Sequence, residues 1–279
     1  MAAVSEVARA DLRRLRRRRL MESRWILWVT TPVLLLLLLG AWKLYTVISG
    51  VGALTVPPPE AVGGALFELL GRDMLYEAAY YTFYSTVMGF IIAVVVGVGL
   101  GIVLGKMHLL EKISAPFLVA TQVVPKVAIV PLVLLWFGFG IASKIFMAAI
   151  ISFFVVMQNT ILGIRSIDPG HRDLMKVIRA PWWKRIISLD IPSSLPFVLT
   201  GVELGVVFAI TGAIVGEFLG GDDGLGALAV VMLAGMRTDQ LFATVIVMTL
   251  MGFVLYAVVS AIRRVAIPWH ESSGRVTSL

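Results

Sequence analysis

The fold of this chain is decided by residues 80–105, which read YYTFYSTVMGFIIAVVVGVGLGIVLG and contain no charged side chain. A helix needs about 20 predominantly apolar residues to cross the hydrocarbon core of a bilayer. Five further stretches are long and apolar enough: residues 25–48, 116–139, 144–164, 196–219 and 241–262. The sequence therefore predicts an all-α polytopic membrane protein with about six transmembrane helices.

The overall composition agrees with this interpretation and excludes several other classes of protein. Of 279 residues, 59% are hydrophobic and 15% are charged, whereas globular proteins average roughly 45–50% and 25%. A water-soluble fold of this size would lack the polar residues to cover itself. Because the chain has no cysteine, disulfides, thiolate catalysis and cysteine-ligated metals are excluded. Its three histidines lie far apart in the sequence, so we expect no metal site.

The basic residues indicate how the chain crosses the membrane. Nineteen of the 24 Lys and Arg lie in the N-terminal segment, the second and fourth connections and the residues after 262, against four in the other connections. The positive-inside rule then places both termini in the cytoplasm. The net charge of +7 therefore reports orientation rather than cargo. The arginines before residue 25 are expected to contact anionic lipid rather than nucleic acid.

The expected organisation is a series of membrane segments without a soluble domain. Residues 1–24 form a basic cytoplasmic segment, 25–48 a first transmembrane helix retained as a signal anchor, 76–267 the core membrane domain, and 268–279 a cytoplasmic tail. Pro57, Pro58 and Pro59 disfavour a regular helix in the outer connection. The later outer connection, residues 220–240, is expected to be a flexible glycine-rich turn with two acids.

The cytoplasmic loop 168–194 is the exception among the connections, because it is long and patterned. An apolar residue recurs every fourth position, at Leu174, Ile178, Trp182 and Ile186, and this spacing favours an apolar helical stripe. Pro181 suits the first turn of a helix, so we expect two short helices that meet near residues 179–180. The pattern fits equally an amphipathic helix on lipid headgroups and a helix inserted into a groove on a cytosolic protein.

Several motifs in and around this loop resemble those of ABC-importer permeases. The loop contains Asp173-Leu174-Met175, then Arg179, a thirteen-residue gap to Pro192, and the sequence IPSSLPFVLTG at 191–201, which resembles the family's coupling-loop pattern. The sequences VPKVAIVPL at 124–132 and VGEF at 215–218 followed by GLG at 224–226 resemble the nitrate, sulfonate, taurine and vitamin-precursor permeases. The resemblance covers roughly residues 80–269.

The resemblance implies a mechanism and a set of partners. Two copies of the permease, most simply a homodimer, form a pathway in the bacterial plasma (inner) membrane, and an extracytoplasmic substrate-binding protein delivers the solute. Each copy docks its coupling helix onto one of two ABC ATPase subunits, which bind ATP and Mg, so the chain itself holds no cofactor and is not an enzyme. The expected coupling residues are Asp173, Leu174, Met175, Arg179, Ala180, Trp182 and Trp183.

The chain departs from the family pattern at four of these positions. Asp173 replaces the usual glutamate, and Leu174 and Met175 replace alanines. Arg179 stands where the family has a glycine. A glycine would permit a left-handed turn there without steric cost, so the arginine predicts either a strained turn or a different local geometry.

Polar side chains inside a bilayer are costly and are candidate functional residues. The candidates for the translocation pathway are Gln122, Lys126, Gln158, Asn159, Glu203 and Glu217. Pro125 and Pro131 bracket Lys126, so the third span is expected to bend there. Lys126 is expected to lie near the pathway or in a structural ion pair with Glu203. For Glu217, a gate and simple solvation at the outer interface both remain open.

Small residues predict where helices pack closely. Gly97, Gly101 and Gly105 recur every fourth position, and Gly212 and Gly216 do so in the fifth span. Such faces let helix backbones approach one another, so we expect the second and fifth spans to pack together, within or between subunits. A nucleotide-binding P-loop is not expected, since the glycine spacing near Lys106 is one residue short.

Two other function classes compete with an importer subunit. A stand-alone secondary transporter or channel often carries internal repeats, and we find none. An intramembrane enzyme would need a catalytic set at membrane depth, and the spans contain no GxSxG or HExxH motif. The expected solute is a small vitamin-like heteroaromatic compound or a sulfonate- or nitrate-type anion, with a slight preference for the former.

Overall fold

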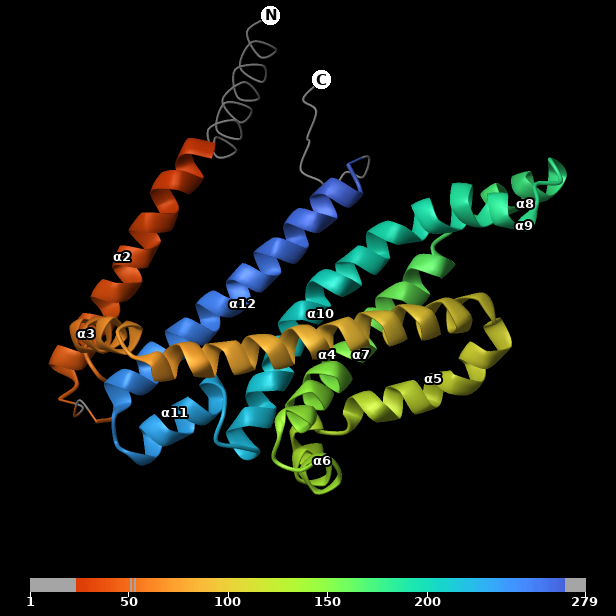
Figure 1. The fold of residues 1–279 in the computed structure, drawn as a ribbon. Coiled ribbons are helices and arrows are strands. Elements are labelled where there is room, and N and C mark those ends of the chain that lie inside the picture. The colour runs from red at the N-terminus through yellow and green to blue at the C-terminus, as the bar shows by residue number, and fades with distance from the viewer. Residues whose placement is uncertain (1–23, 51, 53, 269–279) are drawn as a thin grey trace, which may run out of the picture. The chain divides into compact units, whose positions relative to one another are not determined.

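The structure, a computed structural model, describes residues 24–50, 52 and 54–268 (Figure 1). The arginines before residue 24 and the tail beyond residue 268, for which the sequence predicts cytoplasmic positions, lie outside the described residues. The chain divides into two compact units, residues 1–64 and 65–279.

The first unit contains one long apolar helix, as predicted. Helix α2 spans Arg24–Ile48, and its leucines 34–39 are exposed, as expected of side chains that face lipid. Lys43 on α2 forms an ion pair with Glu60.

A helix was not expected in the outer connection, and that prediction is wrong. Helix α3 spans Pro59–Leu70. A proline is tolerated in the first turn of a helix, because its missing N–H would have no partner within the helix. Pro59 therefore starts this helix rather than preventing it.

The second unit is a bundle of helices joined by short connections. Its elements are α4 (Asp73–Lys106), α5 (His108–Val123), η1 (Lys126–Ile129), α6 (Val130–Phe137), α7 (Ile141–Arg165), α8 (Pro169–Val177), α9 (Trp182–Arg185), η2 (Ile186–Asp190), α10 (Ile191–Leu219), α11 (Leu225–Ala234) and α12 (Thr238–Ala266). Across the described residues, five helical segments are long and apolar enough to span a membrane: Val29–Ile48, Asp73–Lys106, Ile141–Arg165, Trp182–Leu219 and Thr238–Ala266.

The predicted third span is not one continuous helix. It consists of α5, an extended break at Val124 and Pro125, the 3₁₀ turn η1, and α6. A proline disfavours helical geometry in the residue before it, and Val124 has φ −63° and ψ 123° accordingly. The prediction of a bend near Lys126 is confirmed, whereas the prediction of a single helix over 116–139 is wrong.

The second outer connection also contains structure that the sequence did not predict. Within residues 220–240, helix α11 spans Leu225–Ala234. The expectation of a flexible turn over the whole connection is therefore wrong. The sequence LGALAVVMLA buries Leu225, Ala227 and Met232. The apolar content of this short segment, rather than its flanking glycines, decides its conformation.

Helix α7 is the centre of the second unit. The glycine face of α4 packs on it: a Cβ atom placed at Gly101 would lie 2.5 Å from Thr160 Cβ, and one at Gly97 would lie 3.2 Å from Val156 Cβ. The glycines of α10 pack on the same helix, since a Cβ atom at Gly212 would lie 2.6 Å from the carbonyl oxygen of Met147.

The expectation that the second and fifth spans pack together is confirmed, although their glycine faces do not meet each other. Helices α4 and α10 do contact one another, but Gly97, Gly101 and Gly105 on α4 and Gly212 and Gly216 on α10 all approach α7. Lipid supplies no hydrophobic drive for helix association, so close backbone approach is a main source of attraction in a membrane. The glycines therefore build one three-helix core around α7.

We predict that Gly101→Ala destabilises the protein, because the added methyl group meets Thr160 and the carbonyl oxygen of Met157. Overpacking of this kind costs about 1–3 kcal/mol. The matched control is Gly99→Ala, where nothing lies within 4 Å of the added atom and alanine favours the helix. Thermal unfolding in detergent should show a lower midpoint for the first variant alone. Equal midpoints would contradict the packing of α4 on α7.

Candidate functional site

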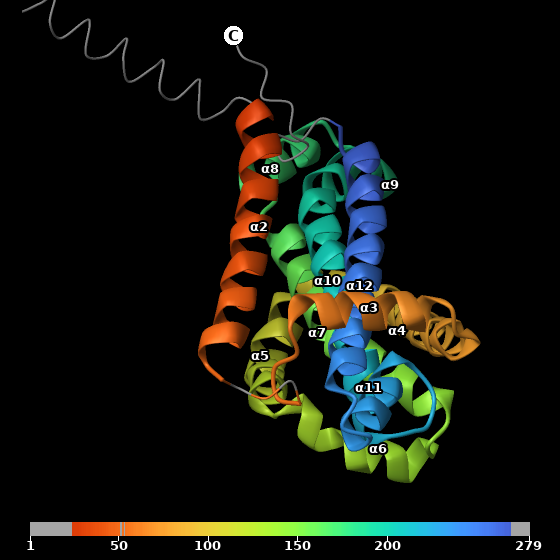
Figure 2. The same cartoon turned by 90° about the vertical axis from the view of Figure 1, so that its left-hand side faces the viewer.

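The loop between α7 and α10 forms two short helices at one end of the second unit. In Figures 1 and 2, α8 and α9 lie at the end of α10 opposite to α6 and α11. Asp168 caps α8 by accepting a hydrogen bond from the N–H of Gly170 at 2.6 Å. The prediction of two helices meeting near residues 179–180 is confirmed, and Pro181 precedes the first residue of α9.

Arg179 adopts the left-handed conformation that the family's glycine would adopt. Its φ is +49°, and the chain reverses there through hydrogen bonds from the N–H of Arg179 to the carbonyl oxygen of Lys176 and from the N–H of Ala180 to that of Met175. A residue with a Cβ atom in this conformation is strained by roughly 1–2 kcal/mol. The left-handed turn is therefore retained, and it is strained because its central residue is an arginine.

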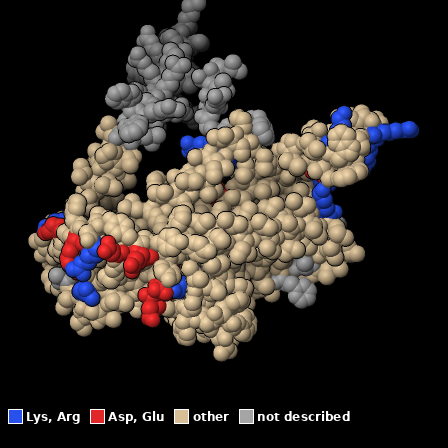
Figure 3. Space-filling model, viewed as in Figure 1, with Lys and Arg blue, Asp and Glu red and all other residues tan. Residues whose placement is uncertain are grey.

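The surface of α8 and α9 is apolar and basic. Leu174, Val177, Ile178, Trp182 and Trp183 are all more than half exposed. The turn divides the predicted apolar stripe, so that its exposed side chains belong to both helices; we refer to this surface as the patch of α8 and α9. Figure 3 shows Lys and Arg gathered at this end; they include Lys176, Arg179, Lys184 and Arg185.

Helix α8 is held to the bundle through the side chain of Arg172. Arg172 Nη2 donates a hydrogen bond to the carbonyl oxygen of Ile164 at 2.7 Å, near the end of α7. Asp173 pairs with Lys176 at 2.9 Å, and both side chains are well exposed. Asp173 thus contacts its own helix, and its carboxylate remains accessible to a partner.

The opposite end of the second unit holds a buried polar cluster around Glu217. Glu217 Oε2 accepts hydrogen bonds from Thr82 Oγ1 at 2.9 Å and from the N–H of Gly226 at 2.8 Å. Thr82 Oγ1 in turn accepts from the N–H of Leu225 at 2.8 Å. These groups satisfy the first N–H groups of α11, which have no partner within the helix.

Glu217 is therefore neither solvated nor exposed at an interface. Its side chain is 1% exposed, which contradicts the hypothesis of simple interfacial solvation. Gly224 is required beside it, because its φ is +106° and a Cβ atom there would lie 2.2 Å from the carboxyl carbon of Glu217. Lys144, fully buried, donates to the carbonyl oxygen of Asp223 at 3.0 Å. The cluster joins α4, α7, α10 and α11.

The expected ion pair between Lys126 and Glu203 does not form. Glu203 on α10 pairs with Arg263 on α12, whereas Lys126 lies in η1 with its ammonium group 5.9 Å from the centre of the Phe154 ring. The break at Pro125 turns Lys126 towards α7 instead of α10. In the sequence, Arg263 is one of the basic residues that indicate orientation, and nothing marks it as the partner of a carboxylate on another helix.

The other candidates for the pathway are dispersed. Gln158 and Asn159 are partly buried on α7; Asn159 Nδ2 donates to the carbonyl oxygen of Val155 at 2.8 Å, and its Cβ packs against Gly201. Gln122 is in α5, and its side chain is outside what the structure describes. Among the side chains that the structure describes, these candidates therefore form no single cluster.

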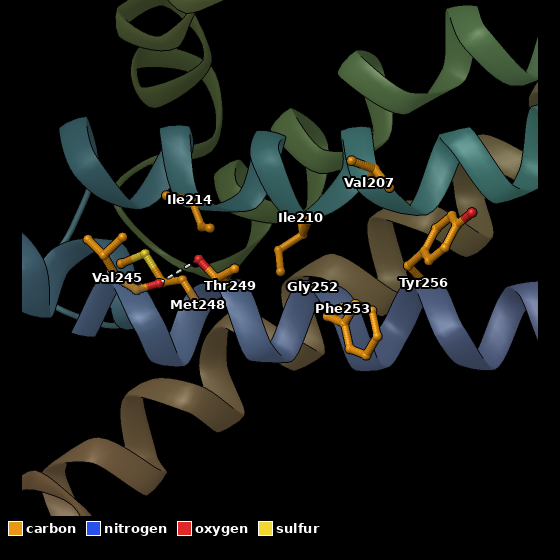
Figure 4. Close-up of a pocket in the computed structure, with 9 residues that line it drawn as sticks. All are labelled: Val207, Ile210, Ile214, Val245, Met248, Thr249, Gly252, Phe253 and Tyr256. Atoms are coloured by element: carbon orange, nitrogen blue, oxygen red, sulfur yellow. Dashed lines mark hydrogen bonds between the residues drawn. The ribbon is translucent and has the colours of Figure 1, made fainter. Parts of the chain in front are cut away.

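A groove of about 500 Å³ lies between α10 and α12 (Figure 4). Its lining is almost wholly apolar and includes Ile210, Met248 and Phe253. Tyr256, which lies beside the pair of Glu203 and Arg263, closes one end. Within the described ranges, no group of His, Asp and Glu side chains could hold a metal ion.

Residues 97–269 match the family of binding-protein-dependent transport system inner membrane components. The chain belongs to this family. It is 34% identical over 241 residues to the riboflavin transport system permease protein RibX of Chloroflexus aurantiacus, which covers 86% of this chain and 90% of that relative. It is 28% identical over 245 residues to the putative aliphatic sulfonates transport permease protein SsuC of Bacillus subtilis, covering 88% and 89%.

A chain of the inward-facing MetNI methionine ABC transporter has the same fold. The match has a TM-score of 0.52 with 16% sequence identity and covers 67% of this chain and 95% of that chain. The permease is therefore a multi-pass inner-membrane subunit of an ATP-binding-cassette importer. It is a transport subunit rather than an enzyme; a separate ATPase and a substrate-binding protein are its partners.

We predict that Glu217→Leu destabilises the permease, because the N–H of Gly226 loses its acceptor and the hydroxyl of Thr82 keeps only the carbonyl oxygen of Ala78 at 3.2 Å. Each buried polar group without a partner costs about 1–3 kcal/mol. Glu217→Gln keeps one acceptor oxygen, so its free energy of unfolding should fall less than that of Glu217→Leu. Phe218→Leu, at the exposed neighbouring position, serves as the control. Free energies of unfolding in detergent test this order. Equal decreases in the free energy of unfolding for Glu217→Leu and Glu217→Gln would contradict the capping of α11 by Glu217.

We also predict that Arg179→Gly stabilises the turn between α8 and α9 by about 0.5–1 kcal/mol, since glycine adopts a positive φ without strain. Hydrogen exchange over residues 175–181 should slow by about two- to fivefold. Lys176→Gly is the control, because a glycine inside α8 weakens that helix and should accelerate exchange. Faster exchange in Arg179→Gly would show that the arginine side chain itself holds the turn.

Proposed function

We propose that the permease acts as a homodimer, with both termini in the cytoplasm, and imports a vitamin-like heteroaromatic solute. The observation that carries the proposal is the exposed apolar and basic patch of α8 and α9. Each copy docks this patch into a groove on one of two ATPase subunits. ATP and Mg bind to those subunits, and the permease itself binds no cofactor.

The composition of the patch favours a protein groove over a lipid surface. A helix that rests on a membrane has one apolar face along its length, whereas here Leu174 and Ile178 belong to one side of a turn and Trp182 and Trp183 to the other. Exposed tryptophans are typical anchors of protein interfaces. The surrounding lysines and arginines favour an acidic rim on the ATPase groove.

The pathway is proposed to include the broken third span. Irregular backbone at membrane depth is tolerated where it faces protein or a water-filled cavity. This proposal is supported by the position of Lys126, which directly follows the break at Val124 and Pro125, is partly buried and lies next to Phe154. Gln158 and Asn159 on α7 complete the candidate lining, together with Gln122 on the preceding α5.

The choice of solute rests on the relatives. RibX, at 34% identity, is named for riboflavin transport, and ThiX of Halalkalibacterium halodurans, at 29% over 202 residues, is named for formylaminopyrimidine transport. Both compounds are nitrogen heteroaromatic. SsuC supports an aliphatic sulfonate as the second candidate.

We predict that Trp182→Asp combined with Trp183→Asp prevents co-purification of the ATPase without preventing membrane insertion. Loss of an interface anchor costs about 2 kcal/mol or more, which weakens binding about thirtyfold. The control is Trp136→Ala, which removes a similarly exposed tryptophan from α6 at the other end of the bundle. Undiminished co-purification of the double variant would contradict the docking site.

We predict ATP-dependent uptake of riboflavin into vesicles that contain the permease, its ATPase and its binding protein. Lys126→Ala should lower this uptake with no loss of ATPase from the complex, because the ammonium group is proposed to line the pathway. Lys112→Ala, an exposed lysine on α5, is the control. Uptake of taurine but not riboflavin would favour the sulfonate alternative. Normal uptake in Lys126→Ala would make Lys126 a structural residue.

A further inference from the structure

A π-helical turn connects the docking helix α9 to the membrane helix α10. In η2, the N–H of Ile191 donates to the carbonyl oxygen of Ile186, five residues earlier. The next residue, Pro192, has no N–H and cannot complete the α-helical bond to Ser188. The proline therefore explains the wide turn, and such turns are frequent at functional sites.

Asp190, the last residue of this turn, is fixed on two sides. Its carboxylate Oδ2 lies 3.3 Å from Nζ of Lys106, the last residue of α4. Its carbonyl oxygen accepts a hydrogen bond from Ser194 Oγ at 2.7 Å. The Asp190 side chain is 9% exposed and the Lys106 side chain 38%. An ion pair with one nearly buried member leaves an uncompensated charge when its partner is removed.

Close helix contacts surround this ion pair. A Cβ atom at Gly105, beside Lys106, would lie 2.9 Å from Ile164 Cβ on α7, and one at Gly163 would lie 2.8 Å from the carbonyl oxygen of Ser194. The ends of α4 and α10 are thus both pressed against the last turns of α7. The ion pair links α4 directly to η2 at this corner.

The docking loop therefore has two separate attachments to the bundle. Helix α8 is held to α7 by the hydrogen bond from Arg172 to Ile164. Helix α9 continues through η2, which is held to α4 by the pair of Asp190 and Lys106. Because a π-helical turn interrupts the regular ladder of hydrogen bonds, it can absorb a tilt of α9 before that tilt reaches α10.

We propose that the ion pair of Lys106 and Asp190 is the strut that makes α4 follow α9 when the ATPase binds nucleotide. The inference rests on the proposed docking of α8 and α9 onto the ATPase. Lys106 and Asp190 are positioning residues: they contact neither nucleotide nor solute, and they act by joining two helices. Without the strut, a displacement of α9 is taken up by η2 and α4 remains in place.

The test uses two spin labels in one chain. The sequence has no cysteine, so Val103→Cys on α4 and Lys184→Cys on α9 are labelled specifically; both positions are exposed. The labelled permease is purified with its ATPase and diluted with unlabelled copies, so that distances within one chain dominate. Distances are measured by pulsed electron paramagnetic resonance without nucleotide and after trapping with MgATP and vanadate.

In the otherwise unaltered chain we expect the same distance in both states, because the strut keeps α4 and α9 together. In Lys106→Met the distance should shift and broaden on trapping, and Asp190→Asn, which preserves side-chain shape, should do the same. Lys106→Arg retains the cation and should behave like the unaltered chain. The exposed Lys112→Met is the control for loss of a nearby positive charge.

Two results would overturn the strut: a distance in Lys106→Met and Asp190→Asn that remains constant between the states, or a distance in the unaltered chain that changes. A merely stabilising ion pair would lower the unfolding midpoint of the variants without creating a nucleotide-dependent distance. Docking is judged on the permease that keeps Lys184 and carries no label, because Lys184 belongs to the proposed docking patch; if no ATPase co-purifies with that permease, the docking proposal itself fails. If the ATPase is bound but the distance in the variants is the same in both states, the proposal of the strut is contradicted and the docking proposal stands.

Discussion

The close approach of α4 and α10 to α7 is the constraint on which the rest of the second unit depends. Apolar helices are solvated as well by lipid as by one another, so helix association must come from close packing and from polar groups. Glycines at the α7 contacts bring the backbones together. This approach brings Thr82 of α4 to Glu217 of α10 and Lys106 of α4 to Asp190. Both polar links would be out of reach with larger side chains between the helices.

The two ends of this core have different chemistry and different tasks. At one end, buried side chains of α4, α7 and α10 hold α11 and its preceding loop in place. At the other end, α8 and α9 expose apolar and basic side chains that find no partner surface within the described part of the second unit. A buried polar cluster at one end and an exposed apolar and basic patch at the other are consistent with the proposed docking of an ATPase on α8 and α9.

The sequence predicts the features that depend on local pattern. Long stretches of uncharged apolar residues predict the long helices, and Pro125 predicts the break before Lys126. It could not predict features that depend on a partner far along the chain. A pair with Glu203 is one of the two positions that the sequence allows for Lys126. The break in the third span instead brings Lys126 to Phe154, and Glu203 binds Arg263. Likewise Thr82, an ordinary threonine in an apolar helix, becomes a cap for α11 after folding.

The central claim is that α8 and α9 are the surface through which an ATPase drives this permease. Hydrogen exchange of the backbone amides, measured on the permease alone and in complex with its ATPase, tests it most directly. Slower exchange in the complex, concentrated in residues 169–185, is the result the account predicts. Unchanged exchange in these residues, with slowing at α11 or elsewhere in the bundle, would contradict it.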